Sequence, residues 1–155
     1  MVRKILRITF IILVGVFVII QFIPSHLPDN NPPEGYNFFT ANEVPPGVET
    51  LLRNACFDCH SQETTYPWYS KVAPVSWLLA RDVRHGRHHL DFSNWSSLEK
   101  RKKLNVLDDI SDEVKGGDMP LEIYVPMHPS ARLTDADRKM IIDWADGLAE
   151  KVFNE

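Results

Sequence analysis

The feature that most constrains this chain is the stretch Cys56-Phe57-Asp58-Cys59-His60, which holds both cysteines of its 155 residues. It has the form C-x-x-C-H, the attachment signature of a c-type haem. Residues three and four apart share one face of a helix, so Cys56 and Cys59 can both reach the vinyl groups of one porphyrin. His60 can then present an imidazole nitrogen to the iron as the proximal ligand. We therefore predict one covalently bound haem c.

Three other interpretations of the two cysteines stay open. A disulfide pair or a thioredoxin-like redox motif would need a βαβ context, and no strand-rich run precedes the motif. A zinc site would need a fourth ligand and usually a second pair of cysteines. A plain structural pair would not need His60. Haem attachment is the interpretation that uses all three side chains.

The overall composition is that of one folded domain with additional segments. Apolar residues make up 44% of the chain and charged residues 25%, both ordinary values for a globular protein. The formal net charge is -4. A chain without a basic excess gives no reason to expect a nucleic-acid partner.

The N-terminus carries a nearly continuous apolar run, Ile8–Ile23, which Ile5 and Leu6 extend to about 19 residues, or about 28 Å as a helix. The basic residues in front of this run are Arg3, Lys4 and Arg7. This charge pattern places the N-terminus in the cytoplasm. We expect residues 1–23 to form an uncleaved single-pass anchor in a bacterial inner membrane, with the C-terminal domain in the periplasm. A cleaved signal peptide is the alternative.

Residues 24–43 are rich in proline and asparagine. Such a composition favours extended, solvated backbone over a packed element. We predict a tether that holds the folded domain, residues 44–155, away from the membrane.

Apolar positions that recur at helical spacing predict four helices in this domain. The predicted helices are Val48–Ala55, Val75–Gly86, Ser97–Lys115 and a last helix capped by Thr134 and Asp137. Ser96-Ser97-Leu98-Glu99 has the form of a capping box, and Gly116-Gly117 is a typical helix end. Asp91–Trp95 is expected to be a loop. We expect the last helix to cross the first one and to bury Trp144 against it.

The distal side of the haem has several candidates. Met119, in Gly117-Asp118-Met119-Pro120, is the predicted distal ligand, because a thioether is a soft ligand and a methionine opposite a histidine raises the reduction potential. The alternatives are Met127, His128 and the cluster His85–His89. The cluster is also consistent with a solvated basic surface turn.

Aromatic residues follow the motif, and Trp68, Tyr69 and Trp77 are predicted to contact the porphyrin or its propionates. Ordinary core packing is the alternative for each of them. The carbonyl group freed beside Pro67 or Pro74 is a candidate acceptor for the Nδ1 proton of His60, since a ligating imidazole is usually held in this way.

From about Val44 to Ala149 the chain resembles the small haem-binding domain family of membrane-tethered bacterial proteins, which is similar in pattern to class I c-type cytochromes. The stretches that carry the resemblance are Asn54–Ser61, Tyr66–Tyr69, Ala73–Trp77, Gly117–Pro120, Leu133-Thr134 and Asp143–Ala145. The resemblance implies an all-α, class I cytochrome c-like domain with one haem, His60 as the proximal ligand and the Met119-Pro120 loop on the distal side.

These features predict a membrane-anchored monohaem c-type cytochrome that exchanges electrons with redox partner proteins in the periplasm or membrane and is not an enzyme. One rival is a haem enzyme module, either peroxidase-like or a subunit of an oxidoreductase. It would need an open sixth position and an acid–base group such as His85, His88 or His128. The other rival is a haem-based sensor or a haem-delivery protein.

Overall fold

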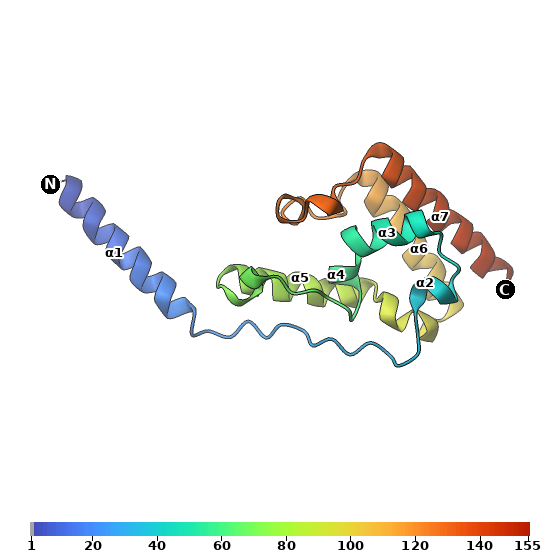
Figure 1. The fold of residues 1–155 in the computed structure, drawn as a ribbon, viewed down its shortest axis with the longest axis horizontal. Helices are drawn as coiled ribbons and strands as arrows, with labels where there is room; N and C mark the ends of the chain where they lie inside the picture. Colours follow the sequence, from blue (N-terminus) through green and yellow to red (C-terminus); the bar gives the residue numbers. More distant parts are fainter. Residues whose placement is uncertain (1) are drawn as a thin grey trace.

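The computed structural model describes residues 2–155, and this part of the chain is helical and contains no strand (Figure 1). The α-helices are α1 (Val2–Ile20), α2 (Phe38–Ala41), α3 (Pro46–Ala55), α4 (Phe57–His60), α5 (Val75–His89), α6 (Lys100–Gly116) and α7 (Asp135–Asn154). The 3₁₀ turns are η1 (Trp68–Lys71), η2 (Phe92–Ser97), η3 (Val125–Met127) and η4 (Pro129–Ala131). The all-α prediction is confirmed.

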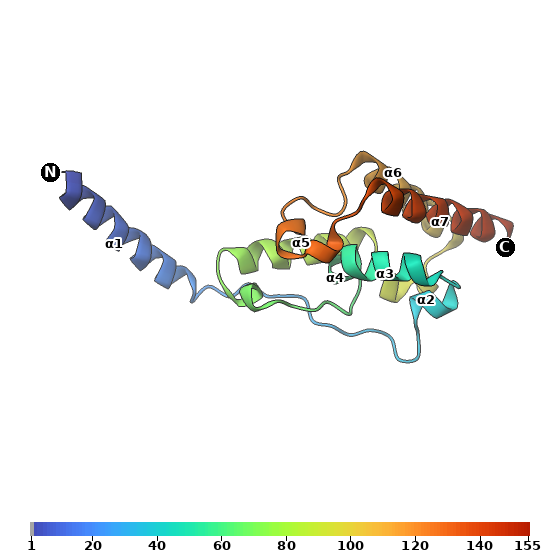
Figure 2. The ribbon, with the colours of Figure 1, turned by 45° about the horizontal axis from the view of Figure 1, so that its top comes forward.

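The core lies between α6 and α7, which run side by side, and α3, which packs against α7 (Figures 1 and 2). Leu52 of α3, Leu107 of α6 and Ile141 of α7 are fully buried there. Each such side chain contributes about 1.5–3 kcal/mol by its removal from water. The predicted packing of the last helix on the first is confirmed, although Trp144 is only half-buried, with its ring 6.2 Å from that of Phe38.

The predicted end of α6 and start of α7 are confirmed. Gly117 has φ +85°, a left-handed conformation that favours glycine at a helix end. Thr134 and Asp137 form a reciprocal capping box at the start of α7.

The start of α6 differs from the prediction. Ser96 and Ser97 close η2, which is capped by Asp91, and α6 begins only at Lys100 with Glu99 before it. The segment that starts at Asp91 is therefore a 3₁₀ turn rather than a loop. Phe92 and Trp95 anchor this turn in the core, which outweighs the local capping signal.

Residues 24–33 are extended as predicted, but they are not a free spacer. They run along α5, and side chains of that helix hold their backbone (Figures 1 and 2). Arg84 donates to the carbonyl of His26 at 2.8 Å, and Arg87 donates to the carbonyl of Asp29 at 2.7 Å. Phe38 and Phe39 are buried, so the packed core begins before the predicted boundary at Val44.

Within residues 2–155 no helix is long and apolar enough to cross a membrane. The expected spanning anchor over residues 1–23 is not supported by this finding; Met1 itself lies outside the described residues. The helix α1 ends at Ile20, and its first two turns carry Arg3, Lys4 and Arg7.

Candidate haem site

The C-x-x-C-H motif forms a separate helical turn. The helix α3 stops at Ala55, the backbone bends at Cys56 (φ -126°, ψ -41°), and α4 then carries the rest of the motif. The amides of Cys59 and His60 both donate to the carbonyl of Cys56, at 3.1 and 2.9 Å. Phe57 fixes the turn, because its ring stacks on that of Phe92 in the core at a centroid distance of 4.9 Å.

The imidazole of His60 is oriented by the backbone of a distant segment. Its Nδ1 lies 3.2 Å from the carbonyl oxygen of Leu90, just past the end of α5. A donated Nδ1 proton leaves the Nε2 lone pair for a metal, and ligating imidazoles are typically held in this way. The sequence prediction of an acceptor beside Pro67 or Pro74 is wrong, because α5 runs to His89 and brings Leu90 against α4.

The chemistry of this turn fits a ligated imidazole. Burial lowers the pKa of His60, although hydrogen bonds to the backbone oppose the shift. A lowered pKa favours the neutral imidazole, which is the form that binds a metal.

Cys56 and Cys59 are both free thiols and are half-buried. Burial raises the pKa of Cys56 to about 12 and that of Cys59 to about 11, where the charges of Asp58 and Asp82 add to the effect. Among residues 2–155 no three His, Cys, Asp or Glu side chains gather into a metal site, so the zinc interpretation finds no support. Two unpaired thiols beside one oriented imidazole are the donor set of a covalently bound haem.

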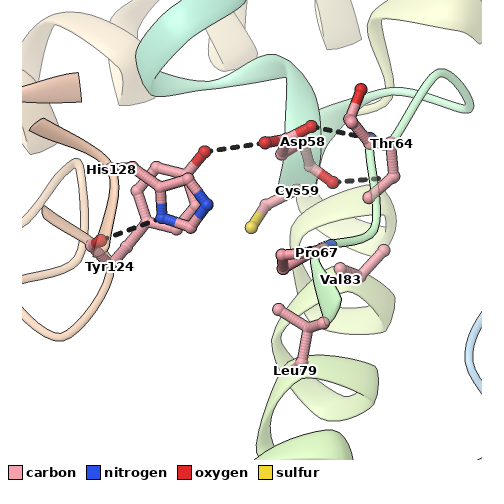
Figure 3. A pocket seen from close by; sticks show the side chains of 9 residues that line it. Asp58, Cys59, Thr64, Pro67, Leu79, Val83, Tyr124 and His128 are labelled. Atoms are coloured by element: carbon pink, nitrogen blue, oxygen red, sulfur yellow. Dashed lines mark hydrogen bonds between the residues drawn. The ribbon is translucent and has the colours of Figure 1, made fainter. Parts of the chain in front are cut away.

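Cys59 forms one wall of a small cavity of about 10 Å³. Figure 3 shows its sulfur pointing toward the facing side chains of Tyr124 and His128. The other residues around the cavity are Asp58, Thr64, Thr65, Pro67, Leu79 and Val83. The cavity holds no more than about one water, so it does not admit a porphyrin in this arrangement.

Tyr124 and His128 form a stacked pair, with ring centroids 3.8 Å apart and planes tilted by 11°. The hydroxyl of Tyr124 donates to Asp58, inside the motif, at 2.8 Å, and burial raises the tyrosine pKa, so the phenol stays protonated (Figure 3). The Nδ1 of His128 lies 3.0 Å from the carbonyl oxygen of Tyr124. Its Nε2 lies 3.2 Å from the hydroxyl of Tyr69.

The predicted site residues divide into two groups. Cys59 and His128 line the cavity, and Tyr69 reaches it through the His128 imidazole. The residues outside the cavity wall are Cys56, His60, Trp68, Trp77, Met119, Met127, His85, His88 and His89. Trp68 is 75% exposed, and the indole of Trp77 donates to the carbonyl of Ile23.

Sequence reasoning missed two contributors to the site, Tyr124 and the carbonyl of Leu90. The signal for Tyr124 was its position four residues before His128, a spacing that stacks two rings on one helical turn. The sequence around Leu90 carries no comparable signal, because its role comes from the packing of α5 on α4.

A helical domain whose C-x-x-C-H turn presents two free thiols and an oriented imidazole defines a class of haem-binding proteins. A family model described as the haem-binding domain matches residues 15–147. The chain therefore belongs to this haem-binding domain family, which confirms the resemblance seen in its motifs. Comparisons with curated proteins and with solved structures gave no match.

Proposed function

We propose that this protein is a monohaem c-type cytochrome that carries electrons between redox proteins. The observation that carries the proposal is the His60–Leu90 hydrogen bond, which fixes a metal-ligating imidazole beside two free thiols. Cys56 and Cys59 would hold the porphyrin through thioethers, and His60 would ligate the iron. When bound, the haem supplies one-electron chemistry between the ferrous and ferric states.

The chain supplies rigidity and exclusion of water. Phe57 anchors the attachment turn in the core, and Leu90 keeps the His60 ring in one orientation. Leu79 and Val83 give the cavity an apolar wall, and burial of a metal centre tunes its reduction potential. A class I cytochrome c-like role and a periplasmic location belong to the same proposal, since thiols that bond haem covalently are expected outside the bacterial cytoplasm.

The test is to produce the full chain in a host equipped for cytochrome c maturation. We expect a mass increase of one haem that survives denaturation, and a spectrum that cycles reversibly between two redox states. Cys56→Ala or Cys59→Ala should leave one thioether, and the double variant should lose the covalent mass. Ser61→Ala, a matched change next to the motif, should keep both thioethers. A colourless wild-type protein would refute the proposal, and efficient turnover of peroxide would favour the rival haem enzyme.

A further inference from the structure

We propose that Arg87 is a positioning residue of the haem site and that it couples the extended segment 24–33 to His60. Through this arginine, a segment far from the motif along the chain helps to set the orientation of the iron-binding imidazole. The inference rests on the proposed function, because it concerns His60 as a ligand of the haem iron. Arg87 acts through the backbone of the attachment turn and is not itself a ligand.

The first observation is that the guanidinium of Arg87 binds the extended segment and the turn after the motif at the same time. Its Nε donates to the carbonyl of Ser61, the residue directly after the motif, at 2.7 Å. Its Nη1 donates to the carbonyl of Asp29 at 2.7 Å. Its Nη2 donates to Oδ1 of Asn30 at 2.8 Å and to Oγ1 of Thr64 at 2.9 Å. The planar fork of an arginine holds these acceptors at fixed relative positions.

The second observation is that Asn30 also binds the turn directly. Its side-chain amide donates to the carbonyl of Thr64 at 2.8 Å, and the backbone amide of Thr64 donates back to Oδ1 of Asn30 at 3.3 Å. The hydroxyl of Thr64, a buried residue, donates to the carbonyl of Asp58 inside the motif at 2.7 Å (Figure 3). A continuous series of hydrogen bonds therefore runs from the extended segment to the attachment turn.

The third observation is that one end of α5 holds both the imidazole of His60 and the backbone next to it. Nδ1 of His60 lies 3.2 Å from the carbonyl oxygen of Leu90. Arg87, three residues before Leu90, binds the carbonyl of the fully buried Ser61. The hydroxyl of Ser61 donates in turn to the carbonyl of Phe57 at 2.7 Å. Loss of the Arg87 contact would let this backbone shift relative to the Leu90 acceptor, and the imidazole would rotate with it.

Arg84 provides a contrast on the same helix. It donates to the carbonyl of His26 at 2.8 Å, so its hydrogen bond ends on the extended segment. The hydrogen bonds of Arg87 continue from that segment to the turn after the motif. Attachment of the segment to α5 and positioning of the His60 backbone can therefore be separated by substitution.

The experiment uses the full chain with covalently attached haem, confirmed by mass, in the ferric state. Proton NMR records the paramagnetic shifts of the haem methyl groups, which depend on the orientation of an axial imidazole. We expect Arg87→Ala and Asn30→Ala to change the order or the spread of these shifts. Arg84→Ala and Asn31→Ala are the matched controls and should keep the wild-type pattern, since the side chains that bind Thr64 are those of Arg87 and Asn30.

A second measurement needs no haem. Amide hydrogen exchange across Phe57–Ser61 in the haem-free protein should speed up several-fold in Arg87→Ala and in Asn30→Ala, because the attachment turn opens more often. The two control variants should exchange at the wild-type rate.

A wild-type NMR pattern in both Arg87→Ala and Asn30→Ala would overturn the inference. A change of equal size in Arg84→Ala would overturn it as well, because the effect would then come from release of the segment alone. If Arg87→Ala does not fold, Asn30→Ala decides the matter, since it leaves α5 and the motif unaltered. Absence of covalent haem in the wild type would instead refute the proposed function, and hydrogen exchange would still test the coupling.

Discussion

Gly86 of α5 lies against the backbone of Cys59 so closely that a Cβ atom on Gly86 would come within 2.4 Å of the Cys59 carbonyl oxygen. The contact brings α5 onto the attachment turn and delivers the Leu90 carbonyl, four residues on, to His60. Glycine, which has no Cβ atom, is therefore required at residue 86 for α5 and the attachment turn to pack this closely.

The substitution Gly86→Ala should lower the free energy of unfolding by about 1–3 kcal/mol, because the clash is with backbone that cannot rotate away. Urea unfolding of the haem-free protein measures this change. The yield of covalent haem should fall as well, since the His60 acceptor shifts with α5.

Gly147→Ala is the matched control. A Cβ on Gly147, in the interior of α7, would meet no atom within 4 Å. Replacement of an exposed helix glycine by alanine should stabilise the protein by about 0.5–1 kcal/mol. Equal effects of the two substitutions would show that the α4–α5 contact is not under steric constraint.

The bond between Tyr124 and Asp58 is expected to hold the cavity wall to the motif. In a double-mutant cycle of Tyr124→Phe and Asp58→Ala, we expect a coupling free energy of about 1–2 kcal/mol, typical of a hydrogen bond to a charged acceptor. Denaturant unfolding of the four haem-free proteins gives the value. Tyr66→Phe is the control, because the Tyr66 hydroxyl donates to the carbonyl of Pro28. A coupling free energy of the same size between Asp58 and Tyr66 would show that the coupling does not come from the Tyr124–Asp58 hydrogen bond.

Sequence predicted those parts of the fold that depend on neighbours along the chain. The C-x-x-C-H turn, the glycine end of α6 and the Thr134–Asp137 box are each specified within four residues. The start of α6 was wrong for a related reason. Ser96 begins a capping-box pattern in the sequence. Burial of Phe92 and Trp95 nevertheless places Ser96 and Ser97 at the end of a 3₁₀ turn.

The parts of the site that sequence missed depend on contacts between segments far apart in the chain. The acceptor for His60 is 30 residues away, and the phenol that binds Asp58 is 66 residues away. No local pattern encodes either pairing. The position of residues 24–33 follows the same logic, since a composition typical of a free spacer says nothing about the arginines of α5 that bind its carbonyls.

Arg87 is expected to be the main attachment of the segment 24–33. Besides the Asp29 carbonyl, its guanidinium donates to the side chains of Asn30 and Thr64. Arg87→Ala should release this segment and accelerate thermolysin cleavage before Leu27 several-fold, because proteolysis requires local detachment of the backbone. Arg81→Ala, an exposed change on the same helix, should leave the rate unchanged. Equal rates for the two variants would show that Arg87 does not hold the segment.

The two motif thiols should react slowly in the folded, haem-free protein. The thiolate is the nucleophile, and burial raises the pKa of Cys59 to about 11 and that of Cys56 to about 12. A pKa two units above that of an ordinary thiol leaves about 100-fold less thiolate at pH 8, so alkylation of Cys59 by iodoacetamide should slow by about that factor relative to the urea-unfolded chain. The folded rate should keep rising with pH up to about pH 11.

The variant Asp58→Asn tests the physical cause of this shift. Asp58 raises the Cys59 pKa through its negative charge, so its neutralisation should speed the alkylation of folded Cys59 and leave the unfolded rate unchanged. The increase should be small, because burial is the larger cause. Mass spectrometry of peptides after timed alkylation follows the two cysteines separately. If folded and unfolded chains were alkylated equally fast, the two thiols would be open to solvent in the folded protein, and burial would not raise their pKa.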